Sequence, residues 1–200
     1  MQDLYLNLQF ITMKRSSIKV FQIGHNKCGT SSICQFFRKN GYSVIHTKKV
    51  TDGTIKKNLA KGDPFLKGLE NWDIFTDSDY ITREFALLEH LYPNAKFIYN
   101  IRPVNNWIKS RVSGQKSGLP WFRNRYGIKN NEDLRNFCWA EYLLHNDRVI
   151  NHFIGKKSKK LLVFNIEEDK ADKLVKFFPE FKFNKFKIFP KYNVSRRSRR

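Results

Sequence analysis

The sequence is short of acidic residues and of cysteine, and each shortage narrows the possible classes of function. Its 200 residues include only 18 Asp and Glu against 38 Lys and Arg, so the formal net charge is +20. A chain with this charge attracts anions such as nucleic acid, acidic lipid, acidic glycan or a polyphosphorylated small molecule. The three cysteines, Cys28, Cys34 and Cys138, have no spacing suited to zinc or redox chemistry. We therefore expect free thiols in a reducing compartment and no metal site.

Long apolar runs are absent too. No run approaches the ~20 residues that cross a bilayer, and residues 1–17 lack the basic start and clean apolar core of a signal peptide. We expect no transmembrane segment and an intracellular, cytoplasmic location. Internal repeats and low-complexity linkers are also missing, so a chain of this length should form one domain. We place it at residues 18–194, between an N-terminal extension (1–17) and a basic tail (195–200).

The chain does contain short apolar segments that alternate with segments of helical periodicity. Strands are expected at residues 18–23, 42–46, 73–76, 96–101 and 161–166. Helices are expected at residues 31–40, 81–91, 132–153 and 171–178, and after Pro103. Residues 48–69 are polar and punctuated by glycine, which predicts at most one short helix. The alternation predicts an α/β fold, in three α/β/α layers with a central parallel sheet.

The first expected strand runs into a loop bounded by Gly24 and Gly29 and then into a helix. Unpaired amides at a helix start form an anion site with the helix dipole, and glycines let the backbone approach a phosphate. Nucleotide hydrolases use G-x-x-x-x-G-K-[ST] for this purpose. Here Thr30 occupies the lysine position, and the lysine lies upstream at Lys27. This displacement argues against an ordinary ATPase or kinase and favours a cation over the far end of a shorter anion chain.

Residues 23–32, IGHNKCGTSS, resemble the 5′-phosphosulfate loop of the sulfotransferases, whose donor is 3′-phosphoadenosine 5′-phosphosulfate (PAPS). The resemblance implies a P-loop-like architecture in which Lys27 holds the phosphosulfate of the donor and assists departure of the phosphate. It also implies a donor-binding set along the loop: Lys27, Cys28, Gly29, Thr30, Ser31 and Ser32.

Residues 92–103, YPNAKFIYNIRP, resemble the strand of the same family that ends in arginine and is followed eight residues later by a serine. The resemblance implies that Arg102 and Ser110 grip the 3′-phosphate of the donor, although Arg-Pro replaces the common Arg-Asp-Pro. Arg102 is expected at the C-terminal tip of a parallel strand, where open α/β sheets bind ligands. Residues 161–168 are similar to a late strand of bacterial-type members. Residues 187–193 resemble a segment that folds over the donor, which makes Lys191 a further phosphate contact.

The resemblance implies metal-independent, in-line transfer of a sulfuryl group to a hydroxyl or amine, and this reaction benefits from a general base. In the family the base is a histidine or carboxylate that often comes from the strand before the arginine strand, here residues 73–79. Asp77 follows the apolar part of that strand and is the favoured base, with Asp79 and His46 as alternatives.

Other histidines and aromatic residues receive weaker assignments. His25 either lines the loop or is solvated, and solvation is the commoner state of a loop histidine. We assign no role to histidines in the expected helices, such as His145. Four aromatic residues are expected near the donor or in a loop after the arginine helix, where they either stack on a ligand or pack in the core: Trp107, Trp121, Phe122 and Tyr126.

Two other functions remain open. A nucleotide kinase or NTPase uses the same type of loop, but the missing lysine after Gly29 counts against it. A basic nucleic-acid or acidic-glycan binding protein on a degenerate enzyme fold would account for the lysine cluster at 156–160 and for the arginine-rich tail; nucleic acid is not the favoured partner. For a sulfotransferase, the positive charge favours an anionic acceptor, and a glycan, a lipid or a small molecule all stay open.

Overall fold

A parallel sheet of five strands forms the centre of the molecule. The computed structural model describes residues 18–113, 119–183 and 189. The strands are β1 (Val20–Gln22), β2 (Val44–Ile45), β3 (Ile74–Phe75), β4 (Lys96–Ile101) and β5 (Leu161–Asn165). Their order is β2-β3-β1-β4-β5 and every neighbouring pair is parallel. The expected α/β fold with a central parallel sheet is confirmed.

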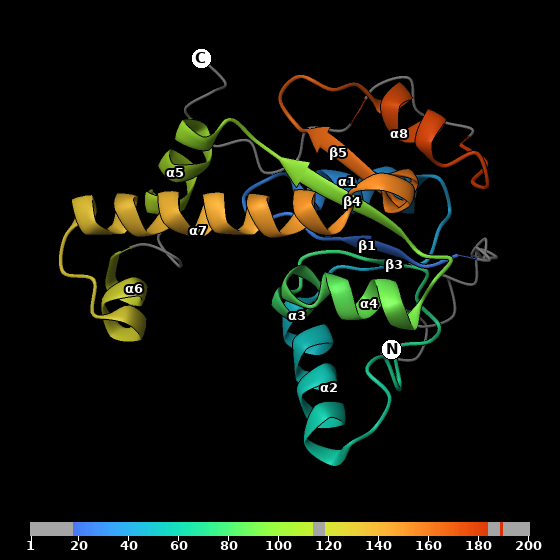
Figure 1. The fold of residues 1–200 in the computed structure, drawn as a ribbon, viewed down its shortest axis with the longest axis horizontal. Helices are drawn as coiled ribbons and strands as arrows, with labels where there is room; N and C mark the ends of the chain where they lie inside the picture. Colours follow the sequence, from blue (N-terminus) through green and yellow to red (C-terminus); the bar gives the residue numbers. More distant parts are fainter. Residues whose placement is uncertain (1–17, 114–118, 184–188, 190–200) are drawn as a thin grey trace, which may run out of the picture.

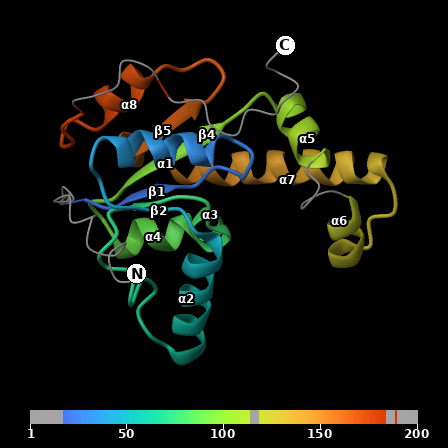
Figure 2. The ribbon, with the colours of Figure 1, turned by 180° about the vertical axis from the view of Figure 1, so that it is seen from behind.

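Helices cover both faces of this sheet (Figure 1). They are α1 (Thr30–Lys39), α2 (Lys48–Lys61), α3 (Asp79–Arg83), α4 (Phe85–Leu91), α5 (Val104–Val112), α6 (Leu119–Tyr126), α7 (Asn131–His152) and α8 (Ala171–Phe177), with a 3₁₀ helix over Gly155–Lys160. Figures 1 and 2 show α1 and α8 on one side of the sheet, α3 and α4 on the other, and α7 extending beyond the sheet towards α5 and α6.

Alternate side chains of each strand enter two separate cores, because successive residues of a strand point to opposite faces. On β4, Ile98 packs in the core beneath α1 and α8, whereas Phe97 and Tyr99 pack in the core beneath α4 and the C-terminal part of α7. On β1, Val20 and Phe21 divide in the same way. These strands are apolar on both faces, which is why they read as continuous hydrophobic runs.

A third core lies away from the sheet. Trp107 of α5 and Phe122 of α6 are fully buried there, and Leu134 and Cys138 of α7 pack with them. Trp107 and Phe122 are therefore core residues in the described structure, whereas Trp121 and Tyr126 are exposed. This cluster holds α5, α6 and α7 together at the C-terminal edge of the sheet.

Three details of the expected secondary structure are wrong. Residues 48–61 form a helix of 14 residues, α2. Its buried face consists of polar Thr51 and Asn58 beside Ile55, so the sequence shows no apolar periodicity here. The helix expected over 81–91 is divided at Glu84 into α3 and α4, and Ser78 caps α3 by accepting from the Ile81 N–H at 3.2 Å. The loop expected after the arginine helix contains α6.

Several predictions from the sequence concern residues outside the part of the chain that the structure describes. The extension at 1–17, the tail at 195–200 and the segment around Lys191 belong to this group. In the described residues, no helix is both long and apolar enough to cross a membrane.

Gly24, just after β1, lies against β4 so closely that no side chain fits. A Cβ at this position would be 2.0 Å from the main-chain O of Asn100. We expect Gly24→Ala to lower the free energy of unfolding by about 2–4 kcal/mol, as strained core substitutions do, measured by urea denaturation. Gly53→Ala in α2 is the matched control, because its Cβ would meet nothing within 4 Å; we expect it to be stabilising by about 0.5–1 kcal/mol. Equal effects of the two substitutions would contradict the close approach.

Candidate active site

The loop between β1 and α1 has a backbone conformation that side-chain-bearing residues rarely adopt. Lys27 (φ 67°) and Gly29 (φ 78°) both lie in the left-handed region, which costs of order 1–3 kcal/mol at a non-glycine residue. A Cβ at Gly29 would be 2.8 Å from Cγ2 of Ile166, so this position requires glycine for space as well. The two left-handed residues turn the chain so that α1 begins directly at Thr30.

Asn100 on β4 holds the loop against the sheet. This residue is buried; its Nδ2 donates to the main-chain O of Cys28 at 2.7 Å, and its Oδ1 accepts from the Gly24 N–H at 3.0 Å. Oδ1 also accepts from Nε2 of Gln22, whose Oε1 accepts from the Asp77 N–H at 3.1 Å. Two buried side-chain amides therefore join the C-terminal ends of β1, β3 and β4 to the loop.

Side chains from α5 and α7 hold the first half of the loop. Nε1 of Trp107 donates to the main-chain O of Asn26 at 2.8 Å, and the Arg111 guanidinium donates to Oδ1 of Asn26. Nε2 of His145 donates to the main-chain O of Ile23 at 2.8 Å. These three bonds fix the first half of the loop to α5 and α7.

The start of α1 offers unused donors. The N–H groups of Ser32 and Ile33 donate to the Gly29 carbonyl at 3.0 and 3.1 Å, but the N–H groups of Gly29 and Thr30 reach no acceptor in the described residues. The exposed Lys27 side chain has no carboxylate partner among those residues either. With no acidic residue in the first turn, these groups and the helix dipole form a site for an anion.

Ser31 is positioned by His46, which follows β2. Thr76 Oγ1 donates to the Ile45 carbonyl at 3.1 Å and therefore accepts from Nδ1 of His46 at 2.8 Å. The other ring nitrogen, Nε2, then accepts from Oγ of Ser31 at 3.2 Å. Burial lowers the pKa of His46, against the opposing effect of nearby Asp77. A neutral His46 between two hydroxyl groups is a positioning residue in this arrangement.

Arg102 directly follows β4 and lies against the loop. Its Nη1 donates to the main-chain O of Lys27 at 3.5 Å, while its Nε lies 2.5 Å from Oε1 of Glu167. The other carboxylate oxygen of Glu167 accepts from Nδ2 of Asn106 at 2.7 Å. Ser110, which is half-buried, lies on the same helix as Asn106. The guanidinium that the sequence assigns to an anion thus already binds a carboxylate.

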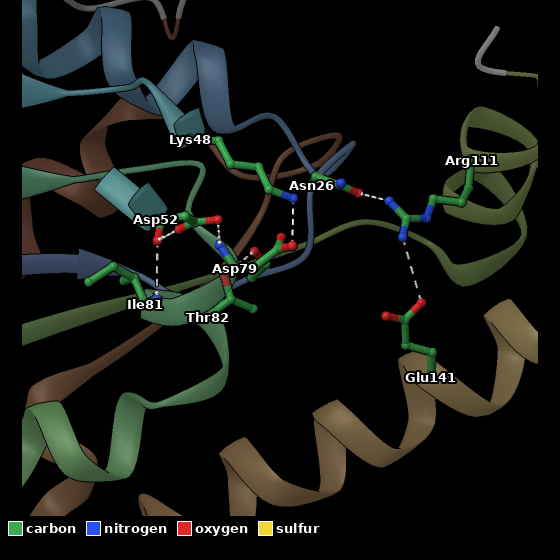
Figure 3. A network of polar contacts seen from close by, with 10 residues as sticks. Asn26, Lys48, Asp52, Asp79, Ile81, Thr82, Arg111 and Glu141 are labelled. Atoms are coloured by element: carbon green, nitrogen blue, oxygen red, sulfur yellow. Dashed lines mark hydrogen bonds and ion pairs between the residues drawn. The ribbon is translucent and has the colours of Figure 1, made fainter. Parts of the chain in front are cut away.

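A cavity of about 710 Å³ opens beside the first half of the loop. It is lined by Asn26 and His25 of the loop and by residues of α2, α3, α5, α6 and α7. Figure 3 shows Asp79 with Lys48 on one side of Asn26, and Arg111 with Glu141 on the other. Basic side chains are the commonest type in the lining: Lys48, Arg83, Arg111, Arg125 and Arg148.

The three candidate bases occupy different places. Asp79, at the start of α3, lines the cavity and lies 2.5 Å from Nζ of Lys48. Asp77 does not line the cavity; it is half-buried, with a left-handed backbone (φ 57°) that turns the chain after β3. His46 does not line it either, and lies behind the start of α1. Of the three, the structure brings only Asp79 to the cavity.

His25 is not the solvated residue that was expected. Its ring centroid lies 5.0 Å from that of Trp107, 5.9 Å from that of Tyr142 and 4.6 Å from that of His145. Desolvation, together with the charges of His145 and Arg111, lowers its pKa to about 3, and burial also lowers the pKa of His145. Both imidazoles are therefore neutral at pH 7.

Several lining residues are absent from the site predicted from the sequence. His145 was given no role, and Glu141 and Arg148 were not singled out, although all three line the cavity from α7. Their spacing of four and then three residues places them on one face of the expected helix, which was a usable signal. Arg83 and Arg111 carried no comparable signal, because their positions depend on how α3 and α5 pack.

The three cysteines are buried free thiols, as expected. Burial raises the pKa of Cys28 to about 12 and that of Cys138 to about 11. The thiol within the loop is thus not a thiolate, and it contributes its main-chain carbonyl rather than its sulfur. The described residues contain no group of three or more His, Cys, Asp or Glu side chains that could hold a metal ion.

The buried His25 predicts a stability that falls in acid. Its folded pKa of about 3 lies below the value of 6.5 in an unfolded chain, so only the unfolded state takes up this proton as the pH falls from 6.5 towards 3. The resulting loss is at most about 1.4 kcal/mol per pH unit. We expect His25→Asn to reduce the drop in the free energy of unfolding between pH 6.5 and 5 by about 1–2 kcal/mol, measured by urea denaturation. The control is His90→Asn, at an exposed position of α4. An unchanged pH dependence in His25→Asn would refute the lowered pKa of His25.

Comparison with known proteins assigns the chain to a family. A family model of the sulfotransferase domain matches residues 19–126, which is more than half of the chain. A comparison with curated proteins finds no significant match. The matched range contains the loop after β1, the end of β3 and the arginine that follows β4. The chain therefore belongs to the sulfotransferase domain family.

Proposed function

We propose that this chain transfers a sulfuryl group from PAPS to a hydroxyl or amine of an acceptor, without a metal ion. Membership of the family supports sulfuryl transfer in general, and PAPS is our inference for the donor. The observation that carries it is the start of α1, where the N–H groups of Gly29 and Thr30 and the ammonium of Lys27 lack partners among the described residues. A nucleotide kinase would place its lysine where Thr30 stands.

The donor would lie along the second half of the loop and the end of β4. Lys27 would bind the phosphosulfate, with the main chain of Cys28 and Gly29 and the groups of Thr30, Ser31 and Ser32 around the 5′-phosphate. Arg102 and Ser110 would bind the 3′-phosphate, and Lys191, outside the described residues, would add a contact. The working domain in this proposal spans residues 18–194.

Transfer breaks the bond between sulfur and the bridging oxygen of the 5′-phosphate and forms a bond between sulfur and the acceptor oxygen or nitrogen. Lys27 and the free amides at the start of α1 would stabilise the negative charge left on the phosphate. The fold holds the amides in place before any ligand binds, so they need little reorganisation as the charge develops. This arrangement accounts for a strained lysine at φ 67°.

We favour Asp79 as the general base, because, of the three candidates, only Asp79 lines the cavity. It would accept the proton that the acceptor loses as the new bond forms. Nζ of Lys48 lies 2.5 Å from its Oδ2, so the carboxylate is oriented while its other oxygen remains available. Asp77 keeps a place in the proposal as the alternative, since it precedes Asp79 by two residues at the same edge of the sheet.

Calorimetry with 3′-phosphoadenosine 5′-phosphate, the product of the donor, tests the donor site. We expect tight binding of this nucleotide, much weaker binding of ATP and AMP, and a loss of roughly 10–100-fold in affinity in Lys27→Ala and in Arg102→Ala, because each removes a charge-assisted hydrogen bond. Lys56→Ala, an exposed lysine on α2, controls for the loss of one positive charge.

The ion pair between Arg102 and Glu167 provides a further variant for this experiment. Glu167→Gln keeps the size of the side chain and one of its two acceptor oxygens, which now serve Arg102 and Asn106 separately. It removes the charge that competes with a phosphate, so we expect several-fold tighter binding of the nucleotide. Equal, weak and salt-sensitive binding of all three nucleotides in every variant would sink the donor assignment and would favour a general anion-binding protein.

Substitution of the two carboxylates separates the candidate bases. We expect Asp79→Asn to lower kcat by roughly 10²–10⁴-fold, the usual contribution of a general base, and to leave the affinity for 3′-phosphoadenosine 5′-phosphate unchanged. Asp77→Asn should change kcat much less. Release of the nucleotide in the presence of a functional acceptor is the measurement, and the reverse order of the two effects would make Asp77 the base.

A further inference from the structure

The cavity beside the loop has more positive charge than its own carboxylates can neutralise. Its lining holds five basic side chains and two acidic ones, Asp79 and Glu141. Asp79 pairs with Lys48 at 2.5 Å, and Glu141 lies 3.8 Å from Arg111. In the described part of the chain, Arg83, Arg125 and Arg148 have no carboxylate within ion-pair distance. Three guanidinium groups of the lining therefore lack a counter-charge from the described residues.

Arg83 and Arg148 stand next to each other across the cavity wall. Nη2 of Arg148 donates to the main-chain O of Arg83 at 3.1 Å, and its guanidinium lies 5.6 Å from the ring centre of Phe85. One arginine comes from α3, the helix that carries Asp79, and the other comes from α7. Both side chains line the cavity, and both charges act on His145. An anionic group of a ligand in the cavity would therefore be attracted by both arginines.

Two neutral imidazoles, those of His25 and His145, lie behind these arginines. Nε2 of His25 is out of contact with solvent and has no hydrogen-bond partner among the described residues. Arg83 contributes to keeping His25 neutral, and Arg148 and Arg83 do the same for His145. Burial raises the pKa of Glu141, opposed by Arg111 and Arg83. The two imidazoles thus add hydrogen-bonding capacity to the wall without adding negative charge.

Exposed aromatic rings complete the cavity at α6. Trp121 and Tyr126 both line it, with 45% and 42% of their surfaces exposed, and Arg125 lies between them in the sequence. Flat rings beside a cation suit a ring-shaped ligand that carries a negative group. The volume of about 710 Å³ lies within the usual range for small-molecule sites.

Resting on the proposed function, we propose that the cavity binds the acceptor, and that this acceptor is a small ring compound carrying both a hydroxyl and an anionic group such as a carboxylate. Asp79 would face the hydroxyl, and Arg83 and Arg148 would bind the anionic group. The proposed donor residues Lys27, Arg102 and Ser110 do not line the cavity, which is why we assign these arginines to the acceptor and not to the nucleotide.

Pairs of acceptors that differ only in charge test this proposal. The probes are a phenol pair, 4-hydroxybenzoate and 4-hydroxybenzamide, and a sugar pair, methyl glucuronide and its carboxamide. With PAPS and about 150 mM salt, we expect kcat/KM for at least one acid to exceed that of its amide at least tenfold. The phenol pair and the sugar pair distinguish the two sources of such an acid. Calorimetric binding of each probe in the presence of 3′-phosphoadenosine 5′-phosphate provides a readout that does not require turnover.

Variants then locate the anionic group. We expect Arg83→Gln and Arg148→Gln each to raise KM for the acid at least tenfold while the amide is used as before, because a neutral probe loses no charge pairing. Arg135→Gln, an exposed residue of α7 outside the cavity, is the matched control for net charge. Affinity for 3′-phosphoadenosine 5′-phosphate should be unchanged in all three variants.

Four outcomes would overturn the proposal: equal use of acid and amide, failure of every acid to bind, an Arg135→Gln effect as large as the others, or a loss of nucleotide affinity in Arg83→Gln. The last outcome would assign the arginines to the donor. Failure of the proposed function looks different, because the nucleotide would then bind neither the parent protein nor any of these variants.

Discussion

The buried side chain of Asn100 is the contact on which the rest of the site depends. One amide group binds the loop at both ends: Oδ1 accepts from the Gly24 N–H, and Nδ2 donates to the Cys28 carbonyl. This is possible only because Gly24 has no side chain to separate β1 from β4. Held near both ends in this way, the loop turns through Lys27 and Gly29, and the N–H groups of Gly29 and Thr30 at the start of α1 have no acceptor among the described residues. A substitution at Asn100 would therefore act on the fold and on anion binding together, since the same bonds serve both.

The excess of basic residues explains why carboxylates of the site form ion pairs with arginine and lysine side chains. The chain has 38 basic residues and 18 acidic ones, so counter-charges are scarce, and three carboxylates near the loop lie within ion-pair distance of a cation. Glu167 binds Arg102, Asp79 binds Lys48, and Glu141 lies near Arg111. The first of these pairs occupies a guanidinium proposed to bind phosphate, so ligand binding there would be an exchange of one anion for another. The net gain from such an exchange is smaller than the gain from binding a free guanidinium, because the existing pair must first be broken.

The parts predicted well from the sequence are those whose signal is local. Residues 96–101 form a strand with the expected bounds, because a buried parallel strand is a continuous apolar run, and the loop was recognisable from two glycines and one lysine. α2 was expected only as one short helix within residues 48–69, because polar Thr51 and Asn58 interrupt its apolar pattern. α6 was missed, because it is held by tertiary packing around Phe122. The cavity could not be predicted at all: it depends on how α3, α6 and α7 pack, and no local pattern encodes that packing.

The loop lies between the cavity and the N–H donors at the start of α1, and this position bears on the side from which an acceptor would attack. Its first half, His25 and Asn26, lines the cavity, whereas its second half forms the start of α1 with its unused N–H donors. In-line transfer requires the attacking atom and the leaving oxygen on opposite sides of the sulfur. In the proposed reaction, the acceptor would approach from the cavity, and the phosphate would leave towards the amides and Lys27. The left-handed turn at Lys27 divides these two halves, which gives a physical reason for strain at this residue rather than elsewhere in the loop.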